Sequence, residues 1–192
     1  MKIIPTPVSI EEKQGTLTLS SLRDLRIADG SDRRITKIAN TLKGEIEELT
    51  GTHIRMKISS CGCTDGGIYI SHGESGEGYT LSVMKNGIEI QGQGAQGAYY
   101  GVQTLRQIIH EYGDTIPCCT IEDAPDFPER GLYHDVTRGR VPTLKQLCHI
   151  ADMLAYYKIN HLQLYVEDAY EFVEYDGIMS AKDVLTAEEI LA

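Results

Sequence analysis

The feature that most constrains the fold is a strand, helix, strand pattern that runs from Asp126 to Asp168. The first strand delivers polar residues to its end at Arg138, and the second, His161–Val166, ends on Glu167 and Asp168. Two parallel strands joined by a helix form the unit from which (β/α)8 barrels are built, and the carboxyl ends of barrel strands build the active site. We therefore expect Arg138, Glu167 and Asp168 to converge at the rim of such a barrel.

The linking helix begins after Thr143, which has the capping-box spacing with Gln146. Helical periodicity predicts one buried face, made of Leu144, Leu147, Cys148, Ala151, Leu154 and Ala155. A complete barrel needs roughly 250 residues, more than the 192 of this chain. A last helix is predicted to start at Thr186, whose capping-box partner is Glu189. We therefore expect residues 126–192 to be the truncated beginning of a barrel, and the chain to be a piece of a longer protein.

Residues 1–125 mix alternating apolar runs with two helical patterns, which predicts an α+β domain with an antiparallel sheet and helices. The helical stripes are Ile35, Ile38, Ala39, Leu42, Ile46 and Leu49, closed by Gly51, and Ala95, Ala98, Val102, Leu105 and Ile109, closed by Gly113. Runs 79–83 and 88–91 alternate around Asn86-Gly87, which predicts a hairpin. The acidic, proline-containing stretch 122–128 resembles a connector, so we place the domain border near residue 125.

The formal charge of −10 and the lack of a basic cluster argue against nucleic acid as a partner, because binding phosphate backbones relies on Lys and Arg. No apolar run approaches membrane-spanning length, and the first residues do not resemble a secretory signal. Five cysteines, an odd number, fit a reducing compartment better than a disulfide framework. We therefore expect a cytoplasmic protein without a membrane partner.

Two motifs invite readings that their context does not favour. Gly92 to Gly97 form a literal G-x-G-x-x-G, with Glu122 and Asp123 further on as ribose-binding candidates. The preceding strand, however, alternates polar and apolar residues, whereas the first strand of a dinucleotide-binding fold is buried on both faces, so we assign the glycines to tight packing of helix on sheet. Cys61-Gly62-Cys63 and Cys118-Cys119 lack the C-x2-C spacing of zinc ligands. We therefore expect no metal and no cofactor.

The polar residues around the first barrel strand each have an ordinary and a functional interpretation. Arg138 is either an ion-paired surface residue or a rigid fork of donors for sugar hydroxyls, with Asp168 as an acceptor one strand away. We expect His134 to be half-buried and hydrogen-bonded, with a place in the site as the alternative. Asp135 and Glu167 are further candidates because they flank these residues.

Linked motifs give the chain a resemblance to glycoside hydrolase family 20, the β-N-acetylhexosaminidases. In the last third they are Asp126-Phe127-Pro128, Arg130-Gly131, Asp135-x-x-Arg138, Ala155-Tyr156-Tyr157-Lys158-Ile159-Asn160 and Leu162-x-Leu164 leading to Asp168. Earlier they are Gly87-Ile88-Glu89-Ile90, Gly97-Ala98-Tyr99-Tyr100-Gly101-Val102-Gln103-Thr104-Leu105 and Thr120-Ile121-Glu122-Asp123, which are similar to the non-catalytic domain that precedes the family's barrel. The resemblance covers nearly the whole chain.

The resemblance implies a substrate-assisted retaining hydrolysis of terminal β-linked N-acetylhexosamine, in which the 2-acetamido oxygen attacks the anomeric carbon. It gives Arg138 the role of gripping hydroxyls of the terminal sugar, and Asp168 a place in a hydrogen-bonded relay that tunes the general acid. The family's Asp-Glu catalytic pair comes from the fourth barrel strand, beyond this chain, so we expect the 192 residues alone to be inactive. An unfinished barrel also exposes apolar surface, which predicts disorder or a homo-oligomer through residues 126–192.

The chain departs from the family pattern after both motifs. Gly139-Arg140 stand where the family commonly has His and an aromatic residue, and Ala169-Tyr170-Glu171-Phe172 stand where it commonly has a second Asp and then Gln-Gly-Trp. These departures leave the preferred sugar and linkage open. The alternatives are a carbohydrate-binding or interaction module without catalysis, a dinucleotide-binding protein, and a sister glycosidase family with the same leading domain.

Overall fold

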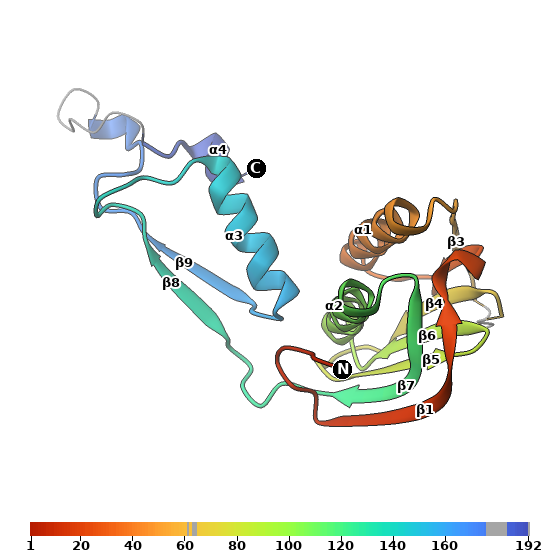
Figure 1. Cartoon of the computed structure of the whole chain (residues 1–192). Coiled ribbons are helices and arrows are strands. Elements are labelled where there is room, and N and C mark those ends of the chain that lie inside the picture. The colour runs from red at the N-terminus through yellow and green to blue at the C-terminus, as the bar shows by residue number, and fades with distance from the viewer. Residues whose placement is uncertain (61, 63–64, 176–183, 192) are drawn as a thin grey trace. The chain divides into compact units, whose positions relative to one another are not determined.

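The computed structural model describes residues 1–60, 62, 65–175 and 184–191, and the chain divides into two compact units, Met1–Asp126 and Phe127–Ala192 (Figure 1). In the part of the chain that is described, the first unit holds a seven-stranded sheet in the order β1-β7-β5-β6-β4-β2-β3. Its strands are β1 (Ser9–Thr18), β2 (Asp24–Ile27), β3 (Arg55–Ile58), β4 (Gly67–His72), β5 (Tyr79–Met84), β6 (Gly87–Gly92) and β7 (Thr115–Asp123). A short 3-10 helix, η1 (Leu19–Ser21), joins β1 to β2.

The predicted α+β class of this unit is confirmed, but its sheet is mixed. β1 with β7, β7 with β5 and β5 with β6 pair antiparallel, whereas β6 with β4, β4 with β2 and β2 with β3 pair in parallel. The parallel half arises because α1 (Arg33–Thr50) carries the chain from β2 back to the start of β3, a crossover that only parallel neighbours require. The predicted hairpin is β5–β6, and Met84 pairs with Gly87 so that Lys85 and Asn86 form its turn.

Both helices of the first unit, α1 and α2 (Ala95–Tyr112), lie on the same side of the sheet (Figure 1). Asp32 caps α1 by accepting from the backbone of Arg34, and Gly51 ends it in the left-handed conformation. The predicted stripes are buried except for Leu49, which is 46% exposed, and Ala95, which is half-buried against the core. The strand residues on the helix side, such as Leu81, Ile90 and Ile121, alternate with polar residues on the other side, so the core lies between the sheet and the two helices.

The N-terminal segment is held on α2 by hydrogen bonds. The side-chain amide of Gln107 accepts from the backbone N–H of Ile4 at 2.8 Å and donates to the Ile4 carbonyl at 2.8 Å. Glu111 accepts from the backbone N–H of Lys2 at 2.7 Å, and Ile3 is 5% exposed within the core. The first residues of the chain therefore belong to the packed domain.

The second unit consists of two parallel strands and a helix, as its pattern predicts. They are β8 (Gly131–Asp135), α3 (Leu144–Tyr156) and β9 (His161–Tyr165), followed by η2 (Val173–Tyr175) and the short α4 (Ala187–Leu191). Thr143 and Gln146 form the predicted capping box of α3, and Thr186 and Glu189 form that of α4.

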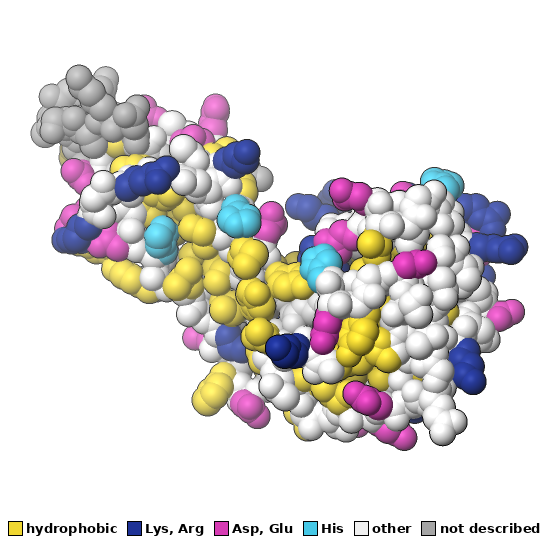
Figure 2. Space-filling model, viewed as in Figure 1, with side chains coloured by type: hydrophobic (Ala, Val, Ile, Leu, Met, Phe, Trp, Pro, Cys, Tyr) yellow, Lys and Arg dark blue, Asp and Glu magenta, His cyan; other side chains and the backbone are white. Residues whose placement is uncertain are grey.

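The predicted buried face of α3 is only partly correct. Leu147 is buried against Val136, Ala169 and Leu185, but Cys148 and Ala151 are exposed. Two strands offer too little surface to cover the whole stripe of a helix. Apolar side chains accordingly remain open to solvent over this unit, including Tyr133 at 58%, Met153 at 41% and Leu132 at 37% (Figure 2).

Candidate functional site

The ends of β8 and β9 lie side by side and bring several polar side chains together. The strands are in parallel register, with Asp135 opposite Tyr165, and the backbone N–H of Val136 donates to the carbonyl of Tyr165 at 3.1 Å. Val136 packs with α3, so Asp135 and Tyr165, one residue out of phase, share the opposite face of the pair.

Arg138 is held between carboxylates from both strand ends. Its Nη1 donates to Asp135 Oδ2 at 2.9 Å, and its Nη2 donates to Glu167 Oε1 at 3.2 Å. The guanidinium carbon lies 5.3 Å from the centroid of the Tyr165 ring, within the range of a cation–π contact. The Arg138 side chain is still 64% exposed, so it is oriented by its partners while remaining accessible to a ligand.

Asp135 organises the turn that carries Arg138. Its Oδ1 accepts from the backbone N–H of Thr137 at 2.9 Å, from the Thr137 hydroxyl at 2.7 Å and from the backbone N–H of Arg138 at 3.3 Å. These bonds, with that of the Thr137 N–H strongest, hold the pKa of Asp135 well below its usual range. Asp135 in turn raises the pKa of Arg138, so this pair stays charged over any physiological pH.

Tyr165 and Glu167 form the other side of this arrangement. The Tyr165 hydroxyl donates to Glu167 Oε1 at 2.6 Å, and this bond to a carboxylate raises the pKa of the tyrosine. Glu167 has a backbone φ of 34°, a conformation uncommon for residues other than glycine. The sequence does not single out Tyr165 as a site residue, because a hydroxyl that bonds two residues onward depends on that backbone conformation.

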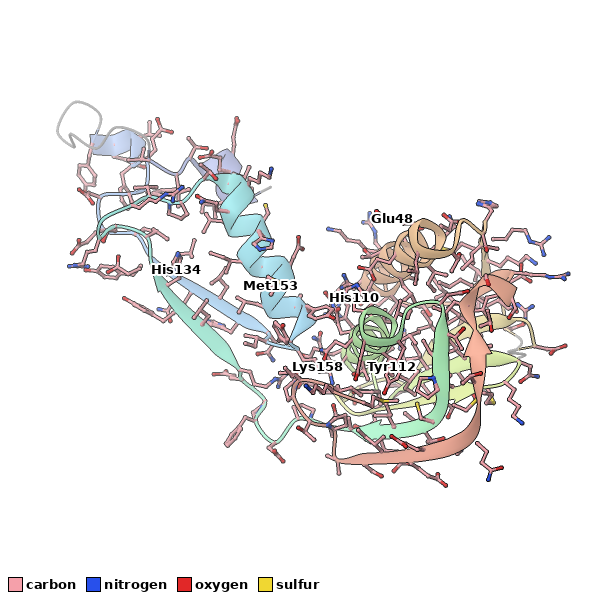
Figure 3. The ribbon with its side chains drawn as sticks, in the orientation of Figure 1. Glu48, His110, Tyr112, His134, Met153 and Lys158 are labelled. Carbon is pink, nitrogen blue, oxygen red and sulfur yellow. The ribbon has the colours of Figure 1, made fainter. Side chains whose placement is uncertain are left out.

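The other predicted site residues, Asp168 and His134, form no hydrogen bond or ion pair with Arg138. Asp168 is exposed, and its carboxylate makes no hydrogen bond or ion pair with any residue that the structure describes. His134, labelled in Figure 3, is half-buried as predicted, and its predicted hydrogen bond has no partner among the described residues. His134 shares its face of β8 with Val136, the face on which α3 packs, so it points away from Asp135.

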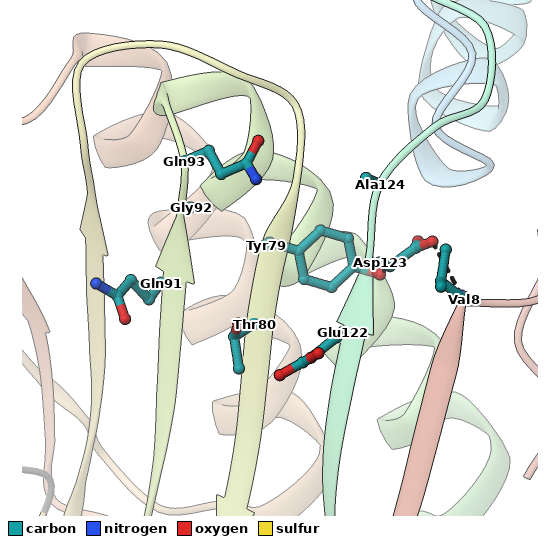
Figure 4. A pocket seen from close by; sticks show the side chains of 9 residues that line it. All are labelled: Val8, Tyr79, Thr80, Gln91, Gly92, Gln93, Glu122, Asp123 and Ala124. Carbon is teal, nitrogen blue, oxygen red and sulfur yellow. Dashed lines mark hydrogen bonds between the residues drawn. The ribbon is translucent and has the colours of Figure 1, made fainter.

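The first unit has a polar groove at one end of its sheet. It has a volume of about 430 Å³ and is lined by Val8, Tyr79, Thr80, Gln91, Gly92, Gln93, Glu122, Asp123 and Ala124 (Figure 4). Asp123 accepts from the Tyr79 hydroxyl at 2.9 Å and from the backbone N–H of Val8 at 3.4 Å. Exposed Gln91 and Glu122 offer amide and carboxylate groups, which suit a ligand rich in hydroxyls.

The Gly-rich turn is explained by packing. A Cβ on Gly92 would lie 2.2 Å from the backbone N of Ala98, and a Cβ on Gly97 would lie 2.1 Å from the carbonyl oxygen of Gly78. Both glycines therefore allow α2 to start directly against the sheet. Asp123, a ribose-binding candidate in the dinucleotide interpretation, instead accepts from Tyr79.

The described residues contain no group of three or more His, Cys, Asp or Glu side chains arranged to hold a metal ion. Cys61 and Cys63 lie outside the described residues, whereas Cys118 and Cys119 are buried in β7, where burial raises the pKa of Cys119 to about 11. None of the helices in the described ranges has the length and apolar character needed to span a bilayer.

Comparison with known proteins identifies the first unit. The family model "Glycosyl hydrolase family 20, domain 2" matches residues 1–124. A beta-hexosaminidase of Akkermansia muciniphila is 38% identical over 95 residues, which is 48% of this chain and 19% of that protein. A beta-N-acetylhexosaminidase of Cellulomonas fimi is 29% identical over 175 residues, 86% of this chain and 34% of that protein. The chain thus spans about a fifth to a third of the length of these relatives.

A solved structure shares the fold. The chitobiase of Flavobacterium johnsoniae superposes with a TM-score of 0.82 at 23% identity, covering 98% of this chain and 31% of that one. At this level of identity the likeness concerns the fold alone.

Proposed function

The chain belongs to glycosyl hydrolase family 20, and we propose that it forms the leading part of a glycosidase that releases terminal β-linked N-acetylhexosamine. The observation that carries the proposal is Arg138, presented at the ends of two parallel strands and oriented by Asp135 and Glu167 while 64% exposed. An arginine fixed in this way offers a rigid fork of donors to neighbouring hydroxyls. The names of the relatives, hexosaminidases from several bacteria, support the same substrate class.

In this proposal β8, α3 and β9 are the first β-α-β unit of a (β/α)8 barrel, and residues 1–125 are the non-catalytic domain before it. The face of β8 and β9 that carries Asp135 and Tyr165 would line the barrel interior, because α3 covers the other face. This arrangement puts Arg138 at the carboxyl rim, where barrel enzymes bind their substrates.

The proposed chemistry divides between this chain and residues beyond it. Arg138 would bind and orient hydroxyls of the terminal sugar, and Asp168 would take part in the relay that tunes the general acid; the exposed carboxylate of Asp168 is open to such a partner. Attack by the substrate's acetamido oxygen and protonation of the leaving oxygen would depend on an acid pair that the matched motifs here do not include. The 192 residues alone would then bind weakly and not cleave.

Hydrolysis of an aryl β-N-acetylglucosaminide and of the matching galactosaminide tests the proposal. The full-length gene product should hydrolyse at least one of them, and the 192-residue chain neither. Arg138→Ala in the full-length protein should lower kcat/KM by about a hundredfold or more, because a charged donor to the substrate is lost. Arg140→Ala is a matched control, since Arg140 has no ion pair among the described residues. A full-length protein inert on both glycosides would contradict the proposal.

A second candidate, a carbohydrate-binding module without catalysis, is favoured by the groove of the first unit. Gln91 and Glu122 line it with exposed polar groups. Under this alternative, calorimetric titration of the 192-residue chain with N-acetylglucosamine would detect binding that Gln91→Ala weakens, and the full-length protein would bind without cleaving. Hydrolysis of the glycosides by the full-length protein therefore distinguishes the two candidates, because only the glycosidase would cleave them.

A further inference from the structure

The residues at the ends of β8 and β9 determine how the Arg138 side chain is oriented. Arg138 has five N–H donors, and the carboxylates of Asp135 and Glu167 take one each at 2.9 and 3.2 Å. The Asp135 contact is local, because the two residues are three apart in one turn. The Glu167 contact is different, since it joins the end of β8 to the end of β9 and so decides where the guanidinium points between the strands.

Glu167 is itself fixed on two sides. Its Oε1 accepts from the Tyr165 hydroxyl at 2.6 Å as well as from Arg138, so a single oxygen receives both donors. The Tyr165 ring also lies under the guanidinium, 5.3 Å from its carbon. Tyr165 therefore contacts Arg138 directly through its ring and indirectly through Glu167, and loss of the hydroxyl alone would release the carboxylate while leaving the ring in place.

We propose that Tyr165 and Glu167 act together as positioning residues that aim Arg138 and restrict it to uncharged hydroxyls of the sugar. This inference rests on the proposed function for the identity of the substrate. The positioning of Arg138 by Tyr165 and Glu167 is independent of that function. One guanidinium here faces two bound carboxylates, and the exposed carboxylate of Asp168 follows directly in the chain. An anionic group on the terminal sugar would meet an excess of negative charge, whereas a hydroxyl can accept from the remaining guanidinium donors.

Three variants of the full-length protein separate the parts of this arrangement. Tyr165→Phe removes the hydroxyl and keeps the ring, and Glu167→Gln keeps an acceptor and removes the charge. Tyr133→Phe is the matched control, because Tyr133 lies on the same face, with its ring 6.1 Å from that of Tyr165, and its hydroxyl has no partner among the described residues.

The kinetic result expected for Tyr165→Phe is a KM about five- to tenfold higher with kcat within about twofold, because a loosened binding group weakens ground-state binding. For Glu167→Gln the expected result concerns two substrates, a 6-O-sulfated and a neutral aryl β-N-acetylglucosaminide. The kcat/KM for the sulfated substrate divided by that for the neutral one should rise by about threefold or more, since one repelling charge is gone. Tyr133→Phe should change neither quantity. Unchanged KM in Tyr165→Phe, or an unchanged ratio in Glu167→Gln, would overturn the proposal.

A second measurement does not depend on turnover. Phenylglyoxal modification of Arg138 in the 192-residue chain, followed by mass spectrometry with Arg140 as internal reference, should be about threefold faster in Tyr165→Phe and Glu167→Gln than in the parent or Tyr133→Phe, because a released guanidinium is more accessible. Equal rates in all four chains would overturn the positioning role. If the full-length parent hydrolyses no glycoside, the proposed function fails, and the modification rates still decide this inference.

Discussion

The buried hydroxyl of Tyr79 is a single group that contributes to the stability of the first unit. Its hydroxyl pairs with Thr104 Oγ1 at 2.6 Å and donates to Asp123 Oδ2 at 2.9 Å, while the residue is 5% exposed. Burial raises the pKa of Tyr79 far above its usual range, so the group remains a neutral donor. This hydroxyl joins β5, α2 and the end of β7.

Tyr79→Phe should destabilise the domain by about 1–3 kcal/mol, because buried Thr104 and half-buried Asp123 would each lose a partner. Urea unfolding followed by circular dichroism measures the change. Tyr99→Phe is the control, since the Tyr99 hydroxyl has no hydrogen bond among the described residues and its removal should cost little. A loss of equal size in both variants would contradict the role given to the Tyr79 hydroxyl.

Asp32 at the start of α1 gives a pH-dependent contribution. Hydrogen bonds from the side chain and then the backbone of Arg34 lower its pKa from 3.8 to about 2. A lowered folded-state pKa stabilises the fold above the unfolded value, and this stabilisation is lost as the pH falls from about 4 to about 2. Asp32→Asn keeps the capping acceptor without the charge, so its urea midpoint should fall less steeply over that window. Parallel curves for the two proteins would refute the assignment.

The residues around Arg138 show how far the sequence predicts a site. Convergence of Arg138 with Glu167 follows from a parallel β-α-β unit, in which both strand ends lie at one edge. The Tyr165 hydroxyl bond could not be predicted, because it needs the positive φ of Glu167. The isolation of Asp168 within the described residues could not be predicted either, since alternation along a strand ceases to apply beyond its last residue.

Periodicity in the sequence predicts individual helices and hairpins more directly than it predicts the order of strands in a sheet. Helices α1 and α2 and the β5–β6 hairpin have local patterns that predict them. The order of the strands is different, because β1 pairs with β7 and β4 with β6 across long stretches of chain, and no local signal specifies those partners. The periodicity of α3 predicts more buried residues than the structure shows. Burial depends on which elements cover the helix, and the local sequence does not specify these.

Gly97 in the first turn of α2 and Gly44 within α1 predict stability changes of opposite sign when each is replaced by alanine. Gly97→Ala should destabilise the domain by about 2 kcal/mol or more, because the new Cβ would lie 2.1 Å from the Gly78 carbonyl oxygen. Gly44→Ala should stabilise it by about 0.5–1 kcal/mol, because Gly44 is exposed within α1 and its Cβ would meet no atom within 4 Å. Unfolding free energies in urea test both, and a harmless Gly97→Ala would disprove the packing role.

At the scale of the whole molecule the two units differ in how much they bury. The first has a large continuous core, whereas the described residues of the second form a small buried cluster, namely Val136, Leu147, Ala169 and Leu185. Small cores provide little stability. Amide hydrogen exchange should therefore be faster throughout β8, α3 and β9 than in β4 to β6, and equal protection in the two units would contradict this.

Exposed apolar surface of the second unit predicts self-association of the 192-residue chain. Phe127, Tyr133 and Val173 are 70%, 58% and 75% exposed, and among described residues β8 and β9 pair only with each other. Light scattering should show a mass that rises with concentration, and a chain ending at Asp126 should remain monomeric. A compact monomer of the longer chain, with protected amides in its second unit, would contradict the prediction.

The pairing of β1 with β7 has a consequence for how the protein is made. Ser9 pairs with Glu122 and Ile4 bonds to Gln107, so during synthesis residues 4–9 find their partners only after about a hundred more have been added. At roughly 5–20 residues per second, this wait lasts on the order of 5–20 seconds. Throughout that interval the nascent chain carries an unpaired β1 and an uncovered Ile3, so the sheet cannot close until β7 has been made.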